Sequence, residues 1–475
     1  MTRTDPGVHG GVAAYDHFAS DLSLGVGQCV VWASIAIGIV TALIASTSVT
    51  GVILILLIQV MFLLCALWRV LLAVASRHAR PAFPPLSVTA DLPRYSVLVA
   101  LLDEADVLPQ LVERLAAIDY PPDRLDGFLI LEAHDHVTIA AAEDCDRPDW
   151  LKILIAPAAS PKTKPRALNH GLSHATGEFV TVYDAEDDPD PYQLQEAASR
   201  FQNDRSGALW TLQAPLRIRT RHASDSRFLD RQFAVEYASL FEVTLPAMTR
   251  LGLPFPLGGT SNHFRVDALR SVGGWDAYNV TEDADLGFRM WRAGGSLGVL
   301  TRPTYEAPPG RLVDWLPQRT RWLKGYMQTW GVHTRDVHGL GWRGGIALTM
   351  TLGASLAAAA VHAASLGWVL ASMGLALAAG VTPDTPQFSL GVLFIGTGAA
   401  WLNGLLGARR AGIAYTWSDM LMAPAYWSLL TLGFFHALWR LILEPHAWDK
   451  TRHRPDPRTE VIAYPEALDA GREAA

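Results

Sequence analysis

Residues 183–187 read Tyr-Asp-Ala-Glu-Asp and place three carboxylates within four positions. Carboxylate oxygens are the ligands that hard divalent cations prefer, and a cation held this way can bridge the phosphates of a substrate. Asp184 and Glu186 are therefore the predicted metal ligands. The alternative interpretation is a solvated acidic loop or helix cap before Pro189, because acidic residues often begin helices.

A basic segment lies upstream of the acidic one. Lys162 and Lys164 precede the apolar pattern of a helix that continues to about residue 175. The first turn of a helix exposes backbone N–H groups, and together with a nearby ammonium group they suit a diphosphate. A solvated basic loop is the alternative.

A second acidic triplet, Thr281-Glu282-Asp283, opens a predicted helix that runs through Arg292. Thr281 could be the helix cap, with the acids in the first turn where the helix dipole favours them. Asp283 could also accept a proton from an attacking hydroxyl as a general base, if the fold brings it beside a bound donor.

Gln318, Arg321 and Trp322 lie within about one helical turn, so an amide, a guanidinium and an indole can point at one sugar or diphosphate. The same region alternates aromatic and basic residues, as a helix at a membrane interface would. An interfacial anchor is the alternative for the whole segment, and for Trp315 and Trp330 it is the preferred interpretation.

The elements that must position these residues follow from short apolar runs at 95–102, 128–131, 151–155 and 179–183. Helical patterns at 105–118 and 165–175 separate them, which predicts an α/β fold with a mostly parallel sheet. Ligands of such sheets gather at the carboxyl ends of the strands. Acidic residues follow the predicted strands repeatedly, namely Asp103, Glu132, Asp135, Asp184 and Glu186.

Apolar stretches flank this domain. Residues 28–46 and 51–74 are each long enough to cross a bilayer as a helix, and Arg77, His78 and Arg80 after them favour a cytosolic N-terminus and domain. Later stretches at 345–379, 388–406 and 412–443 predict three or four further crossings. The expected order is a cytosolic segment (1–26), a transmembrane hairpin (27–75), a Pro-rich linker (76–93), a catalytic domain (94–314), interfacial helices (315–343), transmembrane helices (344–443) and a cytosolic tail (444–475).

The composition supports a membrane protein. Half of the 475 residues are apolar and 18% are charged, and the formal net charge of -7 offers no basic stripe for nucleic acid. The three cysteines form no metal-ligand pair and support neither redox chemistry nor a disulfide framework. The polar start of the chain is unlike a signal peptide.

In their order and spacing these motifs resemble the family 2 glycosyltransferases, in particular the membrane-integrated processive synthases related to bacterial cellulose synthase. The resemblance covers about residues 95–330. It implies a nucleotide-binding GT-A fold inserted between transmembrane helices, a UDP-sugar donor and Mg or Mn. It also implies roles for single residues: Asp184 for metal and diphosphate, Asp283 as general base, Gln318 and Arg321 for the donor, Trp322 for the acceptor, and Lys164 with Glu132 or Asp135 near the uridine.

Two departures from the family pattern matter. Glu186 stands where a second Asp is usual, so the identity of the second metal ligand is left open between Glu186 and Asp187, which could substitute for it. Glu132 stands where a strand-ending pair of Asp residues is common. Residues 258–263 (Gly-Gly-Thr-Ser-Asn-His) occupy the place of the family's acceptor-contacting loop, but their sequence differs from that of cellulose synthase. The expected acceptor is therefore a glycan other than cellulose. Asn262 and His263 of this loop, and Glu282, are its expected contacts.

The expected function is inverting transfer of a sugar from a UDP-sugar to a growing glycan at the cytosolic face of a bacterial inner membrane. Processive polysaccharide synthesis with export is preferred, because membrane helices lie on both sides of the domain. Membrane lipid and accessory export or regulatory subunits are further expected partners. The alternatives are transfer of one sugar to a lipid, and an inactive sugar-nucleotide-binding scaffold or transporter.

Overall fold

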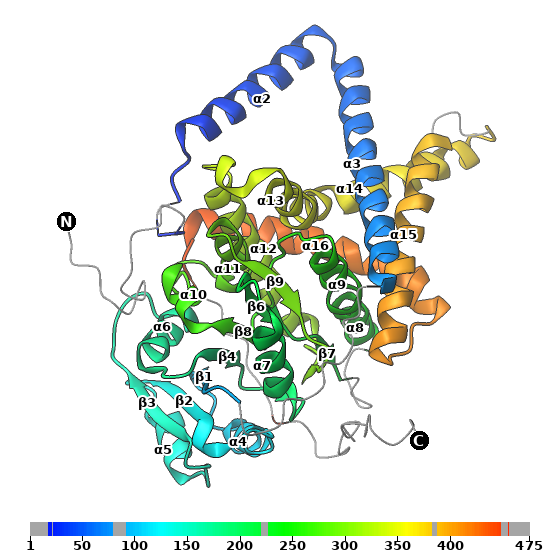
Figure 1. The fold of residues 1–475 in the computed structure, drawn as a ribbon. Helices are drawn as coiled ribbons and strands as arrows, with labels where there is room; N and C mark the ends of the chain where they lie inside the picture. Colours follow the sequence, from blue (N-terminus) through cyan, green and yellow to red (C-terminus); the bar gives the residue numbers. More distant parts are fainter. Residues whose placement is uncertain are drawn as a thin grey trace.

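The computed structural model describes residues 18–20, 22–78, 92–219, 227–381, 387–447 and 455. Most of the expected N-terminal segment, Pro-rich linker and C-terminal tail lie outside these residues. The remaining chain forms an α/β domain with long apolar helices on one side of it (Figure 1).

Seven strands form the central sheet in the order β3-β2-β1-β4-β8-β6-β9. The first four run parallel, whereas β8 runs antiparallel to both of its neighbours, so the expected mostly parallel sheet is mixed in its second half. The strands are β1 (Tyr95–Leu101), β2 (Leu125–Glu132), β3 (Leu151–Ala156), β4 (Phe179–Tyr183), β6 (Leu209–Gln213), β8 (Asn262–Arg265) and β9 (Ser296–Val299).

A smaller sheet lies beside the first, in the order β5-β10-β7. Its strands are β5 (Asp188–Pro189), β10 (Thr304–Glu306) and β7 (Leu216–Ile218). β5 follows the acidic segment directly, so this sheet holds the segment after Asp184 against β10.

Both faces of the central sheet are covered, which explains why its strands read as continuous apolar runs. Successive β1 residues point to opposite faces: Leu98 joins one hydrophobic core, while Val97 and Val99 join the other. The first core is closed by α6 (Lys164–His174), α8 (Arg227–Ser239), α9 (Leu245–Arg250), α10 (Val266–Ser271) and α11 (Glu282–Arg292), and the second by α4 (Leu108–Ala116), α5 (His136–Asp144) and α7 (Gln193–Asn203). A π-helical turn, η4 (Leu240–Thr244), joins α8 to α9, and short 3₁₀ turns occupy 76–78, 122–124 and 338–340.

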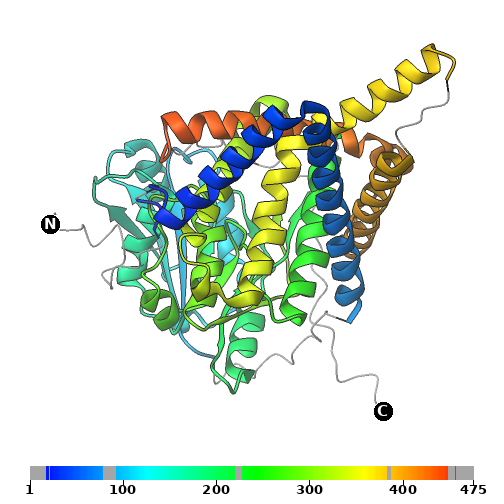
Figure 2. The same ribbon diagram turned by 90° about the horizontal axis from the view of Figure 1, so that it is seen from above.

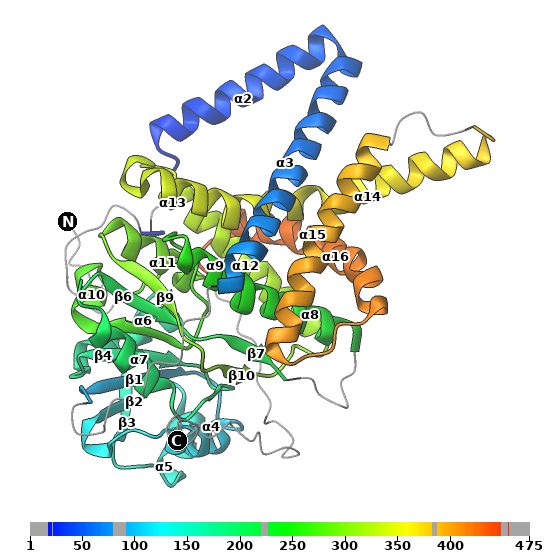
Figure 3. The ribbon, with the colours of Figure 1, turned by 45° about the vertical axis from the view of Figure 1, so that its right-hand side comes forward.

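The part of the chain that the structure describes contains five helical stretches long and apolar enough to cross a membrane. Three of them follow the α/β domain, where three or four were expected. Residues 338–378 form one continuous stretch instead of two. Figures 2 and 3 show α3 beside α15, and the far ends of α2, α3 and α14 projecting away from the domain. The helices are α2 (Val26–Ala45), α3 (Thr47–Ala75), α13 (Gly341–Leu348) with the π turn η6 (Thr349–Gly353), α14 (Ala354–Ala378), α15 (Gln387–Ala411) and α16 (Trp417–Leu443).

Helix α12 (Leu312–His333) connects the domain to these apolar helices, and it packs along α16. Trp315 is fully buried and its indole N–H donates to the Tyr426 hydroxyl over 3.3 Å. The expectation that Trp315 is an interfacial anchor is therefore wrong, because the residue belongs to the protein core between the two helices. At the other end of α12, Gln28 at the start of α2 donates to the Gly331 carbonyl and the Thr334 hydroxyl, each over 2.8 Å.

Candidate active site

The sheet order creates a switch point between β1 and β4. From β1 the chain winds outward through β2 to β3, whereas β4 lies on the opposite side of β1. Crevices outside the carboxyl ends of strands at such a point are the usual ligand sites of open α/β sheets. Asp184 is the first residue after β4 and lies at this place, with its side chain partly exposed.

Lys164 reaches Asp184 from the first turn of α6. Its ammonium group donates to the Asp184 carboxylate and, over 2.8 Å, to the Gly259 carbonyl. Burial alone would lower the pKa of Lys164, but the carboxylates of Asp184, Glu282 and Asp187 outweigh it and raise the pKa. Lys164 therefore stays charged and holds the acidic segment against the glycine loop.

Further carboxylates surround Asp184. Glu186 lines the same cavity, as does Glu306 at the end of β10. Burial, and then repulsion by Asp187, Glu186 and Asp184, raise the pKa of Glu306 well above its ordinary value. The sequence gives no local signal for Glu306, because this residue lies in a three-residue strand without a motif.

Asp187 has a different place. It is fully buried, and its Oδ2 atom accepts from the Asp184 backbone N–H over 2.7 Å and from the Thr260 hydroxyl. Burial, with repulsion by Asp184 and Glu186 next, raises the pKa of Asp187 well above its ordinary value. Asp187 thus shapes the loop instead of lining the cavity, which makes it a poor substitute ligand.

Glu282 and Asp283 begin α11, with their carboxylates at the positive end of the helix. Burial raises the pKa of Asp283, and Lys164 and Arg321 offset part of this shift. Burial and the neighbouring Asp283 raise the pKa of Glu282 to about 7. A carboxylate with a raised pKa in a cavity is a stronger base than an ordinary aspartate, which suits proton abstraction.

The Thr281 side chain makes no cap for α11 but lies against α12. A Cβ atom built on Gly325 would come within 2.1 Å of the Thr281 hydroxyl oxygen, so only glycine allows this approach. Two side chains of α12 complete the contact: Gln328 accepts from the Val280 N–H and Thr329 accepts from the Asn279 amide, each over 3.0 Å. Helix α12 therefore positions the loop that carries Asp283.

Gln318, Arg321 and Trp322 lie on α12 and line the cavity, as the one-turn spacing predicted. The Gln318 amide oxygen is enclosed and has no hydrogen-bond partner in the described part of the chain. The Trp322 ring lies 6.0 Å from Tyr237 and 6.1 Å from Phe233, measured between ring centroids. An amide, a guanidinium and an aromatic face are thus presented together.

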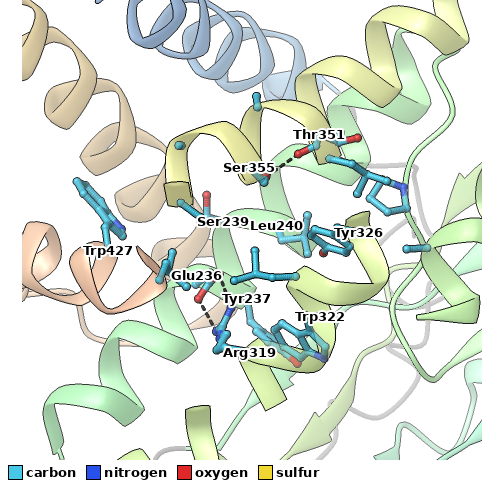
Figure 4. A pocket seen from close by; sticks show the side chains of 18 of the residues that line it. Glu236, Tyr237, Ser239, Leu240, Arg319, Trp322, Tyr326, Thr351, Ser355 and Trp427 are labelled. Atoms are coloured by element: carbon cyan, nitrogen blue, oxygen red, sulfur yellow. Dashed lines mark hydrogen bonds and ion pairs between the residues drawn. The ribbon is translucent and has the colours of Figure 1, made fainter. Parts of the chain in front are cut away.

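Arg319, between these residues, is a hub that the motif alone does not reveal (Figure 4). Its guanidinium donates to both carboxylate oxygens of Glu236 on α8, over 2.7 and 2.6 Å, and to the Tyr426 hydroxyl on α16 over 2.8 Å. It also lies 4.5 Å from the centroid of the Trp322 ring. Arg319 thereby joins α8, α12 and α16 behind the Trp322 ring.

One cavity of about 880 Å³ brings most of the predicted site together. It is lined by residues from β2, α6, the loop after β4, α11 and α12, and by the loop at Gly258-Gly259-Thr260. The predicted site residues in its wall are Glu132, Lys164, Asp184, Glu186, Glu282, Asp283, Gln318, Arg321 and Trp322.

Three predicted residues lie outside this wall. His263 is fully buried in the sheet, with one ring nitrogen 2.7 Å from the Tyr95 hydroxyl and the other 3.1 Å from the Gln193 amide oxygen, and burial lowers its pKa to about 3. Asn262 donates to the Gly258 carbonyl over 2.6 Å and so shapes the glycine loop. The expectation that these two side chains contact an acceptor is wrong, because β8 begins at Asn262 and carries both into the protein.

Asp135 is the third. It caps α5 by accepting from the Thr138 N–H over 3.1 Å, and it accepts from the Asp103 N–H over 2.6 Å. It therefore orders the turn after β1 and does not reach the cavity. Glu132 lines the cavity but forms a buried ion pair with Arg166, whose side chain is only 2% exposed, through contacts of 2.5 and 2.6 Å.

Comparisons with known proteins agree with this fold. The model for "Glycosyl transferase family group 2" matches residues 179–445, more than half of the chain, and the model for "Glycosyl transferase family 2" matches residues 96–214. The solved structure of a mannosyltransferase from Pyrobaculum calidifontis, in complex with GDP-Man and Mn²⁺, aligns with 81% of this chain and 99% of its own, with a TM-score of 0.54 and 17% identity. The expected GT-A-like fold flanked by apolar helices is therefore confirmed.

Two curated relatives are similar over about half of this chain. The β-monoglucosyldiacylglycerol synthase of a Nostoc species is 27% identical over 259 residues, which are 53% of this chain and 54% of that protein. The UDP-forming cellulose synthase catalytic subunit of Komagataeibacter sucrofermentans is 27% identical over 262 residues, 54% of this chain and 33% of that protein. The chain thus spans about half of the first relative's length and a third of the second's.

Proposed function

Because the chain belongs to glycosyl transferase family group 2, we propose that it transfers a sugar from a nucleotide-diphosphate donor to an acceptor hydroxyl, with inversion at the anomeric carbon. By the resemblance of its motifs the donor is a UDP-sugar. The observation that carries the proposal is the shared cavity: Asp283 faces the same space as Asp184, and Lys164 lies close to both.

In the proposed reaction the acceptor oxygen attacks the anomeric carbon while the bond from that carbon to the diphosphate oxygen breaks. Asp283 takes the proton of the acceptor hydroxyl, and the diphosphate leaves with the electron pair. Arg321 and Lys164 stabilise the charge on the leaving group. Gln318 and Trp322 orient the sugars, so the reactants meet in one geometry.

A divalent cation suits the acidic segment. Among the described residues no three His, Cys, Asp or Glu side chains are grouped to hold a metal, but Asp184 and Glu186 line the cavity together. Mg²⁺ and Mn²⁺ sites commonly use one or two carboxylates, and substrate phosphates and water complete the coordination. We propose that Asp184 and Glu186 hold Mg or Mn, which neutralises the diphosphate charge when bound.

The acceptor and the location belong to the same proposal. The relatives are named for a glycolipid and for cellulose, so the two acceptor classes are a growing glycan, which the membrane helices on both sides of the domain favour, and a membrane lipid. We place the domain on the cytosolic face of a bacterial inner membrane, since basic residues follow α3.

Substitution of Asp283 by Asn tests the base. We expect the transfer rate to fall by about 10²- to 10⁴-fold, because general-base catalysis contributes that much, while nucleotide binding stays. The full chain is purified in detergent with Mn or Mg and given UDP- and GDP-linked sugars, and the released nucleoside diphosphate is measured. Equal rates for Asp283→Asn and the unaltered protein would show that another group is the base.

A further inference from the structure

The cavity continues past the catalytic residues into the apolar helices. Its wall includes Ile55, Phe62 and Leu72 of α3, and residues of α14, α15 and α16 on the other sides. Ile55 and Leu72 are 17 residues apart, so at about 1.5 Å per residue the lining follows α3 for roughly 25 Å. That is most of the roughly 30 Å thickness of a bilayer's hydrocarbon core. The site of Asp283 therefore opens into the membrane-spanning part of the protein.

Helix α14 makes room for this extension. Five alanines of α14 lie in the wall, namely Ala354, Ala358, Ala359, Ala360 and Ala364. On α15 the wall includes Gly396, where a built Cβ atom meets nothing within 4 Å. Trp368 lines the cavity and is also 57% exposed on the outer surface, so the cavity reaches the lipid-facing side of the helices.

Arg69, near the domain end of α3, adds a guanidinium to the wall, and the other polar side chains there donate mainly to the protein itself. Gln59 donates to the Ser389 hydroxyl over 2.5 Å, and Asn403 to the carbonyls of Arg69 and Ala399. The hydroxyls of Thr351 and Ser355 donate to carbonyls within their own helical run, the second of which is visible in Figure 4. A glycan chain carries hydroxyls on every ring and would need partners for them, because an unpaired hydroxyl in such surroundings is costly.

The other end of the cavity is polar and aromatic. Figure 4 shows Tyr326 and Trp322 of α12 near Tyr237 and Glu236 of α8, below Thr351 and Ser355. The wall thus changes from apolar at the membrane helices to charged at Asp283 and Asp184. Such a gradient matches a molecule with a hydrocarbon chain at one end and a polar head at the other.

We propose that the acceptor is a membrane lipid whose chain lies between α3, α14 and α15 and whose head-group hydroxyl reaches Asp283. The inference rests on the proposed transferase function and decides its acceptor class. The lipid enters sideways near Trp368, and one sugar is added to its head. A polymer would lie against the apolar side chains of α3, α14 and α15 for most of this length.

The test uses the full chain in phosphatidylcholine vesicles with the sugar nucleotide found active by nucleoside diphosphate release. One arm adds dioleoylglycerol, a second adds phosphatidylglycerol, and a third adds soluble oligosaccharides without further lipid. We expect labelled sugar in the organic phase in a lipid arm, and mass spectrometry should find one sugar per lipid. A long water-soluble polymer formed equally well without added lipid would overturn the proposal.

A matched pair of variants tests where the hydrocarbon chain of the lipid lies. Gly396→Leu fills the cavity, whereas Gly398→Leu puts the same side chain two residues further along α15, outside the wall, where an added Cβ also meets nothing within 4 Å. Each displaced methylene weakens binding about fourfold, so transfer to lipid should fall about tenfold in Gly396→Leu and stay unchanged in Gly398→Leu. Equal lipid transfer by both variants would contradict the proposed position.

Donor turnover distinguishes a failure of the proposed lipid acceptor from a failure of the proposed transferase function. Slow transfer of the sugar to water should release nucleoside diphosphate at the same rate in Gly396→Leu and Gly398→Leu, because the donor site lies at the other end of the cavity. If no donor is turned over with any acceptor or with water, the transferase proposal itself fails. If donor is turned over but no lipid is labelled, only the acceptor inference fails.

Discussion

Single side chains decide the chemistry of the site through their charge. One cavity is shared by five carboxylates, those of Asp283, Glu282, Asp184, Glu186 and Glu306. Lys164 and Arg321 lower the pKa of Asp283 and of Glu282, and Lys164 also donates to Asp184. Burial, together with repulsion by neighbouring carboxylates at Glu282 and Glu306, keeps several carboxyl pKa values high.

The pH profile follows from these shifts. Because the pKa of Asp283 is raised, the carboxylate form is lost at a higher pH than for an ordinary aspartate, so kcat/KM should fall early on the acid side. Arg321→Gln removes a positive charge that lowers the pKa of Asp283, so it should move this acid limb to higher pH. The measurement is kcat/KM from about pH 5 to pH 9.

Glu143→Gln, an exposed carboxyl on α5, is the control and should leave the limb in place. A limb that stays in place or moves to lower pH in Arg321→Gln would mean that Arg321 does not lower the pKa of the base.

At the scale of elements, α12 acts as the support of the site. It carries Gln318, Arg321 and Trp322 into the cavity and, one to two turns later, holds the loop before Asp283 through Gly325 and Gln328. A shift of α12 would therefore move the donor contacts and the base together.

Gly325→Ala tests this support. The added Cβ atom would overlap the Thr281 hydroxyl, and overpacking of this kind costs about 1–3 kcal/mol of stability. We expect a lower melting temperature and a large loss of transfer. Gly331→Ala is the control on the same helix, since its Cβ atom would meet nothing within 4 Å. If the two variants behave alike, close approach at Gly325 is unimportant.

Local sequence was informative where one element carries its own signal. The apolar runs located β1 to β4 because strands buried on both faces are apolar throughout, and Lys164 and Glu282 begin helices as their patterns predicted. Long-range pairing was not visible: the antiparallel β8 and the place of Glu306 depend on partners far along the chain. His263 was misplaced because side chains in a strand alternate between faces, and the start of β8 decides which face it takes.

At the scale of the whole molecule, the apolar helices and the α/β domain form one catalytic unit. The cavity wall draws on both, and α12 packs along α16. We propose that the α/β domain lies on the cytosolic side, because basic residues follow α3.

Cysteine labelling tests the orientation. In a variant without the three native cysteines, Asp123→Cys lies in the α/β domain, where the Asp123 side chain is 80% exposed, and Ser48→Cys lies in the first turn of α3, next to the end of α2. A thiol reagent that does not cross membranes should label Ser48→Cys in intact cells, and Asp123→Cys only after the membrane is opened. The reverse pattern would invert the proposed topology.

The Arg319 hub sets a condition for building hybrid enzymes from this chain. Its guanidinium needs Glu236 and Tyr426 at once, so substitutions at these three positions will not add up as independent effects. Importing α12 alone from a relative would leave a buried charge without its counterpart on α8 or α16. Whoever exchanges the donor segment must exchange the three helices as a set.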